Sequence, residues 1–237
     1  MNSYLDGYGR LHKNVGDTVN RLVFDKDSIA QHQRYVGQEG QAVYVRDMEI
    51  HYPVPWLGEK IEVADCQGSD SPNPLHMAMI QDYLLRTHLI LYVISSRTGL
   101  RRADLRFLSI IKKMGILENM IFVLNVDFSE HESLEGLEQL RRRVTEELAL
   151  IRPEPEVFAF SALYNLFRQL EDALPAKDRA RLEQWRRESA LTAASDAESA
   201  RFQAFFQDQI RNQTLHLLFR NHVERLLVMA GEVAKMV

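Results

Sequence analysis

Three short polar clusters with chemical potential each follow an apolar run: Asp65-x-x-Gly68, Asn125-Val126-Asp127 and Ser161-Ala162. An aspartate at position 65 could hold Mg²⁺ through water, and a glycine lets a backbone amide approach a phosphate closely. The carboxylate of Asp127 could accept two hydrogen bonds from a guanine edge, while a backbone amide of the third cluster meets the guanine oxygen. Each cluster alone also fits a polar cap at a strand end. Their order and spacing together predict a guanine-nucleotide site.

Apolar, β-branched runs precede these clusters and predict the strands that position them. The runs are residues 60–65, 88–95, 120–127 and 156–163. Helical patterns lie between the last three strands, which is typical of a parallel sheet covered on both faces. Because ligands collect at the carboxyl ends of such strands, we expect Asp65 and Asp127 to project from neighbouring parallel strands toward a shared crevice.

The helices between the strands carry recognisable end signals. Residues 100–115 place Leu105, Leu108 and Ile111 at helical spacing, with Gly115 as the expected C-cap. Residues 129–151 open with Ser129 and Glu132, the spacing of a capping box. Upstream, apolar and polar residues alternate in residues 20–24 and 42–53, which predicts an antiparallel hairpin at the edge of the sheet.

The character of the chain changes after residue 164. We expect an α/β domain over 1–164, a charged helical connection over 165–199, and a long amphipathic helix over 200–237 that begins a stalk or neck. Small Ser and Ala residues predict a break near 189–200. Three aromatic residues of the last segment could touch lipid but are expected to pack on the domain: Phe202, Phe205 and Phe206.

Composition excludes several classes of protein. The 237 residues are 46% hydrophobic and carry a net charge of −4 from interspersed signs, so no nucleic-acid footprint is indicated. The apolar runs are too short to span a bilayer. The single cysteine, Cys66, cannot form an internal disulfide, which is consistent with a cytoplasmic protein.

With these motifs in hand, residues 1–230 resemble a dynamin-like GTPase of the bacterial type. "IEVADCQGSDS" resembles the strand and switch II of the family, "VLNVDF" its guanine-reading motif, and "FSAL" its serine-alanine motif. The resemblance implies that Asp65 organises Mg²⁺, that Gly68 contacts the γ-phosphate, and that Asp127 reads guanine. The resemblance also implies that three further residues assist Asp127 in binding guanine: Asn125, Ser161 and Ala162.

The chain also departs from the family pattern. Val126 replaces the lysine of the guanine motif, and Cys66 and Gln67 replace the usual Thr-Pro of switch II. Thr18 is the nearest candidate for the Mg²⁺-binding threonine of switch I, although a surface threonine fits its position better. No GxxxxGK[ST] phosphate-binding loop occurs in the sequence, so we expect no catalytic residue and no tight binding of GTP or Mg²⁺ by this chain.

The opening residues "MNSYLDGYG" resemble the helix that follows the phosphate loop in relatives. We therefore expect an incomplete, GTPase-like, mostly parallel doubly wound sheet with its first strand absent, followed by a C-terminal helical segment. The coding sequence upstream would test this amino-terminal truncation. Strands that flank the gap would leave orphaned backbone groups, at roughly 1–3 kcal/mol each. Either the sheet closes up or another chain supplies a strand, and a homodimer through the sheet edge or the C-terminal helix is expected.

Two functions follow as alternatives. In the first, the complete protein binds GTP or GDP with Mg²⁺ and hydrolyses GTP, while this chain is inactive; contact with membranes is implied only by the resemblance. In the second, the chain is a non-catalytic pseudo-GTPase that acts as a protein interaction module, which the altered guanine motif and switch II favour. An unrelated Rossmann-like enzyme is disfavoured because no GxGxxG occurs.

Overall fold

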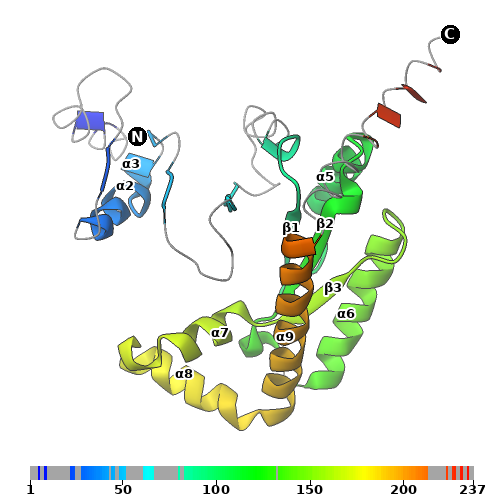
Figure 1. Cartoon of the computed structure of the whole chain (residues 1–237). Helices are drawn as coiled ribbons and strands as arrows, with labels where there is room; N and C mark the ends of the chain where they lie inside the picture. The colour runs from blue at the N-terminus through cyan, green and yellow to red at the C-terminus, as the bar shows by residue number, and fades with distance from the viewer. Residues whose placement is uncertain are drawn as a thin grey trace. The chain divides into compact units, whose positions relative to one another are not determined.

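The computed structural model in Figure 1 gives the fold of the chain. It describes residues 5, 8–9, 22–24, 28–42, 44–45, 48–51, 61–66, 80, 83–131, 133–212, 223, 226–227, 230–231 and 234. The chain divides into two compact units, residues 1–59 and 60–237. Each unit is considered by itself.

The first unit contains short helices: η1 (Ile29–His32), α2 (Gln33–Val36) and α3 (Glu39–Ala42). Two ring pairs accompany them, Tyr8 with Tyr44 at 5.8 Å and Phe24 with Tyr35 at 5.9 Å between centroids. The predicted hairpin of residues 20–24 and 42–53 is wrong for the described part, where residues 22–24 and 48–51 form no strand. An isolated two-stranded hairpin is only marginally stable in water, so alternation of apolar and polar residues is not sufficient to form one.

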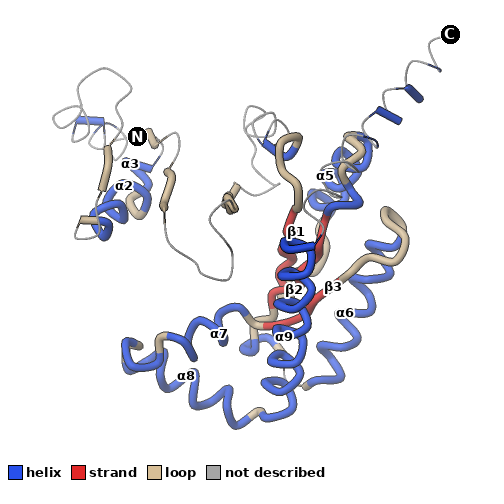
Figure 2. Tube along the Cα trace, in the orientation of Figure 1, coloured by secondary structure: helices blue, strands red, loops and turns tan. Residues whose placement is uncertain are grey.

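The second unit is built on a parallel three-stranded sheet in the order β1-β2-β3, drawn in red in Figure 2. The strands are β1 (Ile90–Ser95), β2 (Met120–Asn125) and β3 (Val157–Phe160). The register aligns Ile90 with Met120 and Phe122 with Val157. The three strand predictions at 88–95, 120–127 and 156–163 are thereby confirmed in place and direction, as is the α/β class.

Helices α5 (Arg102–Lys113) and α6 (Leu134–Ala149) pack on one face of this sheet. The short helices η2 (Leu117–Asn119) and η3 (Phe128–Glu130) flank β2. Leu108 and Ile111 of α5 are fully buried, and Gly115 follows the helix with a φ of +69°, as its predicted capping role requires. The predicted cap of α6 at Ser129 is wrong, because Ser133 accepts the capping hydrogen bond from the Gly136 N–H at 3.2 Å.

Asp104 ties α5 to β1. Its carboxylate accepts hydrogen bonds from the Tyr92 hydroxyl at 2.8 Å and from the Arg101 backbone N–H at 2.8 Å. Burial alone would raise the pKa of the Asp104 carboxyl, but the hydrogen bonds from Arg101 and Tyr92 outweigh it and hold the pKa below its ordinary value. The buried carboxylate therefore stays charged and fully bonded.

The opposite face of the sheet is covered by α9 (Ser189–Asn212), which crosses in front of the strands in Figure 1. The predicted break near 189–200 is wrong, since α9 runs through it; alanine favours helix, and small residues allow close packing on β3. Phe202 and Phe205 contact Phe158 at 5.4 and 5.3 Å between centroids. The prediction that these aromatic residues pack on the domain is confirmed.

Between β3 and α9 the chain forms α7 (Ala162–Gln169), η4 (Glu171–Ala173) and α8 (Ala176–Arg187). Trp185 of α8 stacks on Phe167 of α7 with centroids 5.5 Å apart. Trp185 also meets Phe128 edge-on, at 5.8 Å. This aromatic cluster fixes the α7–α8 pair against the carboxyl end of β2.

The predicted core strand at 60–65 is wrong. Residues 61–66 have no regular secondary structure, and Val63 is 71% exposed. A strand needs a hydrogen-bonding partner, and in the part of the chain that the structure describes no strand lies beside this segment. The sheet described here is consequently smaller than the sequence predicted.

Candidate functional site

The carboxyl ends of β1 and β2 are joined by a short ladder of polar contacts. The Ser96 N–H donates to the Asn125 carbonyl at 3.1 Å, and the Asp127 N–H donates to the Ser96 hydroxyl at 3.0 Å. The Asp127 carboxylate accepts a hydrogen bond from the Ser129 N–H at 3.0 Å. Asp127 therefore serves as the cap of η3.

The carboxyl end of β3 lies beside that of β2. The Ala162 N–H donates to the Asn125 side-chain oxygen at 3.1 Å, so two of the predicted guanine-binding positions contact each other. The Ser161 hydroxyl accepts from the Tyr164 N–H at 3.2 Å and caps α7. The structure thus brings Asn125, Asp127, Ser161 and Ala162 to one edge of the sheet, as parallel strands require.

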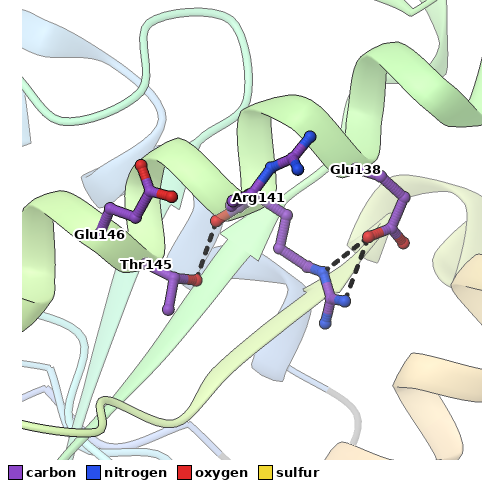
Figure 3. Close-up of a pocket in the computed structure, with 5 residues that line it drawn as sticks. Glu138, Arg141, Thr145 and Glu146 are labelled. Atoms are coloured by element: carbon purple, nitrogen blue, oxygen red, sulfur yellow. Dashed lines mark hydrogen bonds and ion pairs between the residues drawn. The ribbon is translucent and has the colours of Figure 1, made fainter.

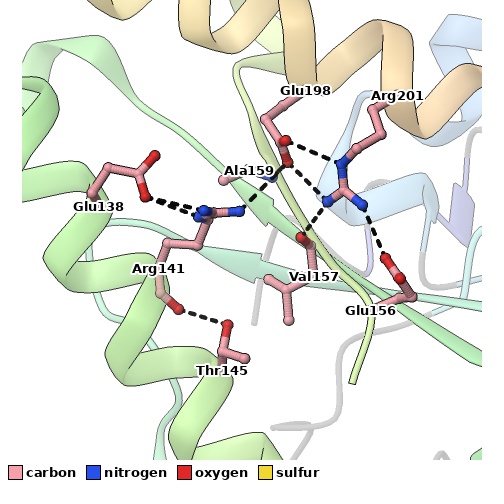
Figure 4. A network of polar contacts seen from close by, with 8 residues as sticks. All are labelled: Glu138, Arg141, Thr145, Glu156, Val157, Ala159, Glu198 and Arg201. Carbon is pink, nitrogen blue, oxygen red and sulfur yellow. Dashed lines mark hydrogen bonds and ion pairs between the residues drawn. The ribbon is translucent and has the colours of Figure 1, made fainter. Parts of the chain in front are cut away.

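Ser195, Glu198 and Arg201 form a stripe on one face of α9 that bonds the outer edge of β3 and that the sequence interpretation missed; Figure 4 shows Glu198 and Arg201 beside β3. The Ser161 N–H donates to the Ser195 hydroxyl at 2.9 Å, and the Ala159 N–H donates to the Glu198 carboxylate at 3.4 Å. Arg201 donates to the Val157 carbonyl at 2.9 Å. The three helix residues stand three apart in sequence, a spacing that puts them on one face and could have revealed the stripe.

Charged groups surround this stripe. The guanidinium of Arg201 also pairs with Glu156 at 3.0 Å and lies over the Phe158 ring at 4.0 Å from its centroid. Burial lowers the pKa of Arg201, but the hydrogen bonds that its guanidinium donates to Glu198 and Glu156 outweigh this effect and raise the pKa overall. The network is a structural clamp between β3 and α9.

Near the β2 end, Arg97 and Glu130 form an ion pair of 2.5 Å. His131 follows, and its Nε2 atom is buried without a hydrogen-bond partner. Burial lowers the pKa of His131 more than the neighbouring charges of Asp127 and Glu130 raise it. The imidazole is therefore neutral at neutral pH.

The switch-like residues do not join this edge. Asp65 lies in the exposed segment 61–66 rather than on a strand beside β2, so the predicted pair of neighbouring strands carrying Asp65 and Asp127 is wrong. Gly68 and Thr18 lie outside the described residues. Cys66 is exposed as a residue, but partial burial of its thiol, followed by the negative charge of Asp65, raises the pKa of the thiol.

A surface depression of about 490 Å³ lies along α6 (Figure 3). Its lining contains none of the predicted site residues; it consists of Glu138, Arg141, Arg142, Thr145 and Glu146. Arg141 pairs with Glu138 at 3.1 Å, and the Thr145 hydroxyl donates to the Arg141 carbonyl at 2.8 Å. The charges at this depression are thus partly neutralised by one another.

Two further searches cover only the part of the chain that the structure describes. Among those residues, no cluster of three or more His, Cys, Asp or Glu side chains is arranged to hold a metal ion. Nor does any helix there combine the length and apolar character needed to cross a membrane.

The fold and its strand-end site define an α/β protein with a parallel sheet and helices on both faces. Comparison with protein-family models, with curated proteins and with solved structures finds no match to this chain. The resemblance to dynamin-like GTPases therefore rests on the residues quoted for it.

Proposed function

We propose that this chain is a dynamin-like GTPase domain in origin that acts as a non-catalytic protein interaction module. The motif resemblance supports the origin, and the parallel order of β1, β2 and β3 is compatible with it. The missing GxxxxGK[ST] supports the lack of catalysis, since that loop supplies most contacts to the phosphates.

The observation that carries this proposal is the use of the strand-end polar groups inside the protein. The Ala162 N–H, expected to meet guanine, is bonded to the Asn125 side chain, and the Asp127 carboxylate caps η3. A base-reading site needs such groups directed at the ligand, because each lost hydrogen bond to the base removes discrimination. Here the same groups stabilise the fold.

A row of exposed leucines on and just after α7 supplies a surface for a protein partner. Leu163, Leu166 and Leu170 are 36%, 47% and 48% exposed. Their spacing puts them on one side of the helix, and contiguous exposed apolar groups are typical of interaction sites. The partner of such a row is the apolar face of another helix.

Binding of guanine nucleotide is the second candidate, favoured by the position of Asn125, Asp127, Ser161 and Ala162 at the carboxyl ends of two neighbouring parallel strands. In that case the complete protein binds GTP with Mg²⁺ and hydrolyses it by attack of water on the γ-phosphate. Asp65 would organise the metal, Gly68 would contact the γ-phosphate, and Asp127 would read the base.

Titration with fluorescent GTP, with and without Mg²⁺, separates the two candidates. The module predicts no saturable binding and no release of phosphate. Saturable, Mg²⁺-dependent binding that Asp127→Ala removes would instead establish the nucleotide site. Any GTP hydrolysis above that of the Asp127→Ala control contradicts the proposal outright.

The partner surface has its own test. Leu166→Asp should remove co-purifying partner protein while leaving the far-UV circular dichroism unchanged. Leu150→Asp is the matched control, because Leu150 is 85% exposed and lies outside the α7 row. Equal loss of partner in both variants, or in neither, rules out the α7 row.

A further inference from the structure

The two edge strands of the sheet, β1 and β3, differ in what covers their outward backbone groups. Side chains of Ser195, Glu198 and Arg201 bond the outward backbone groups of β3 and block strand addition there. At β1 the described residues include no pairing strand and no such side-chain bonds to Leu91 or Val93. The edge sequence Ile90–Ser95 contains no charge and no proline, the usual guards of an exposed edge.

The β1 edge also leaves apolar side chains uncovered. The aromatic residues of α9 pack on Ile121 and Val123 of β2, while Leu91 and Val93 beside them are 40% and 60% exposed. Because the Ser96 N–H faces β2, alternation directs the backbone groups of Leu91 and Val93 toward the open edge. The edge thus offers both hydrogen-bonding groups and an apolar surface.

We propose that residues 61–66 of the same chain add to this edge as a fourth, parallel strand, so that the sheet has a closed state besides the open one described. The segment is apolar at alternate positions, with Ile61 and Val63 separated by Glu62. A parallel crossover needs a dozen residues or more, usually with a helix. Residues 67–89 exceed that length and include helical Ile80, Tyr83 and Leu84.

One hydrogen bond links the segment to the residues that precede β1. The Tyr83 hydroxyl donates to the Glu62 carboxylate at 2.9 Å. Tyr83 precedes β1 in the sequence and Glu62 lies near the start of the segment, an arrangement that a parallel alignment of the segment with β1 permits. Ile80 and Leu84 are buried in the cluster that contains Ile90 and Ile94.

Alternation of the side chains sets the register. In an extended strand Ile61 and Val63 share one face and Glu62 lies on the other, so we place the two apolar side chains on the face where Leu91 and Val93 are exposed. The pairing that follows is Ile61 with Leu91 and Val63 with Val93. It brings Asp65 opposite Ser95, at the strand-end edge that carries Asp127.

Paired cysteines test this register in the full chain. With the native thiol removed by Cys66→Ser, the pair Val63→Cys and Val93→Cys should form an intramolecular disulfide under mild oxidation. Adjacent parallel strands lie about 4.8 Å apart, within the span of a disulfide. Both valines are exposed in the open state, so the substitutions spare the core.

The matched control is Ala64→Cys with Val93→Cys, which places the thiols on opposite faces. We expect disulfide formation about tenfold faster for the Val63 pair, from its higher effective concentration. Equal rates for the two pairs, or no bond in either, would overturn the proposal. A disulfide between two molecules, with a dimer by mass, would also overturn it and assign the edge to a second copy.

Hydrogen exchange on the unsubstituted chain gives a second reading that depends on no variant. The proposal predicts slowed exchange at the backbone amides of Leu91 and Val93, together with slowed exchange within residues 61–66. Exchange at all of these amides as fast as in an unstructured peptide would overturn it.

Discussion

The hydroxyl of Ser195 is expected to contribute measurably to the stability of the second unit. Its oxygen accepts the hydrogen bond of the Ser161 N–H at 2.9 Å, and both residues are only 1% exposed. In Ser195→Ala the buried Ser161 N–H loses this hydrogen-bond acceptor. The change therefore isolates the cost of one orphaned backbone donor.

The magnitude follows from two opposing effects. An unsatisfied buried donor costs about 1–3 kcal/mol. Alanine in place of serine inside a helix returns about 0.5 kcal/mol. We expect the free energy of unfolding to fall by about 1–2 kcal/mol, and the melting temperature by about 2–4 °C per kcal/mol for a unit of this size.

Urea unfolding followed by far-UV circular dichroism measures the loss, and hydrogen exchange at the Ser161 amide locates it. Ser199→Ala is the matched control, since Ser199 lies one turn further along α9 and accepts only from the Asn165 side chain, at 2.9 Å. The control should cost less and leave exchange at Ser161 unchanged. A Ser195→Ala protein as stable as the parent, with equally slow exchange at Ser161, would refute this reasoning.

Three further changes test the core, a buried carboxylate and a helix cap. Phe158→Ala should lower the free energy of unfolding by about 3–5 kcal/mol in urea titration, because the ring is fully buried between β3 and α9; an effect below 1 kcal/mol is incompatible with that packing. The depressed pKa of Asp104 adds stability that is complete above the unfolded pKa of about 3.9 and is lost as pH falls through the lower folded pKa. Asp104→Asn should therefore flatten the acid side of the stability profile, and an unchanged slope between pH 5 and 2 contradicts this. Ser133→Ala should cost about 1 kcal/mol by removing the cap of α6, measured against Ser109→Ala on the exposed side of α5.

The strands that the sequence predicted correctly are those whose partners are close in the chain. β1, β2 and β3 are joined by single helices, so apolar runs and helical spacing were sufficient to identify them. The segment 60–65 was also predicted as a strand from its apolar and β-branched residues, but an apolar run does not show whether a partner strand lies beside it. Strand pairing and register depend on the neighbouring strands of the sheet, so they cannot be predicted from a single apolar run.

Errors in the helices have a similar cause. Ser129 and Ser133 both precede α6, and only the backbone path shows that Ser129 lies in η3, which Asp127 caps, while Ser133 caps α6. The Ser and Ala residues of 189–200 resembled a linker because small polar residues are common in loops. In the structure their small side chains allow α9 to pack closely on β3. Ser195 is buried only because α9 lies directly on β3.

The sequence predicted where the strand-end polar residues lie, but not which groups they bond. The sequence placed the polar clusters at the carboxyl ends of strands, and Asn125 and Ala162 do lie at the ends of β2 and β3. It could not show that they would bond to each other, because amide and carboxylate groups serve internal caps and external ligands equally well.

The clamp that α9 places on β3 limits how copies of this protein can associate. In the open sheet formed by the described residues, strand addition can then proceed only from the β1 edge. A sheet that continues from one molecule into another through the β1 edges ends at a pair, because each partner then presents its blocked β3 edge.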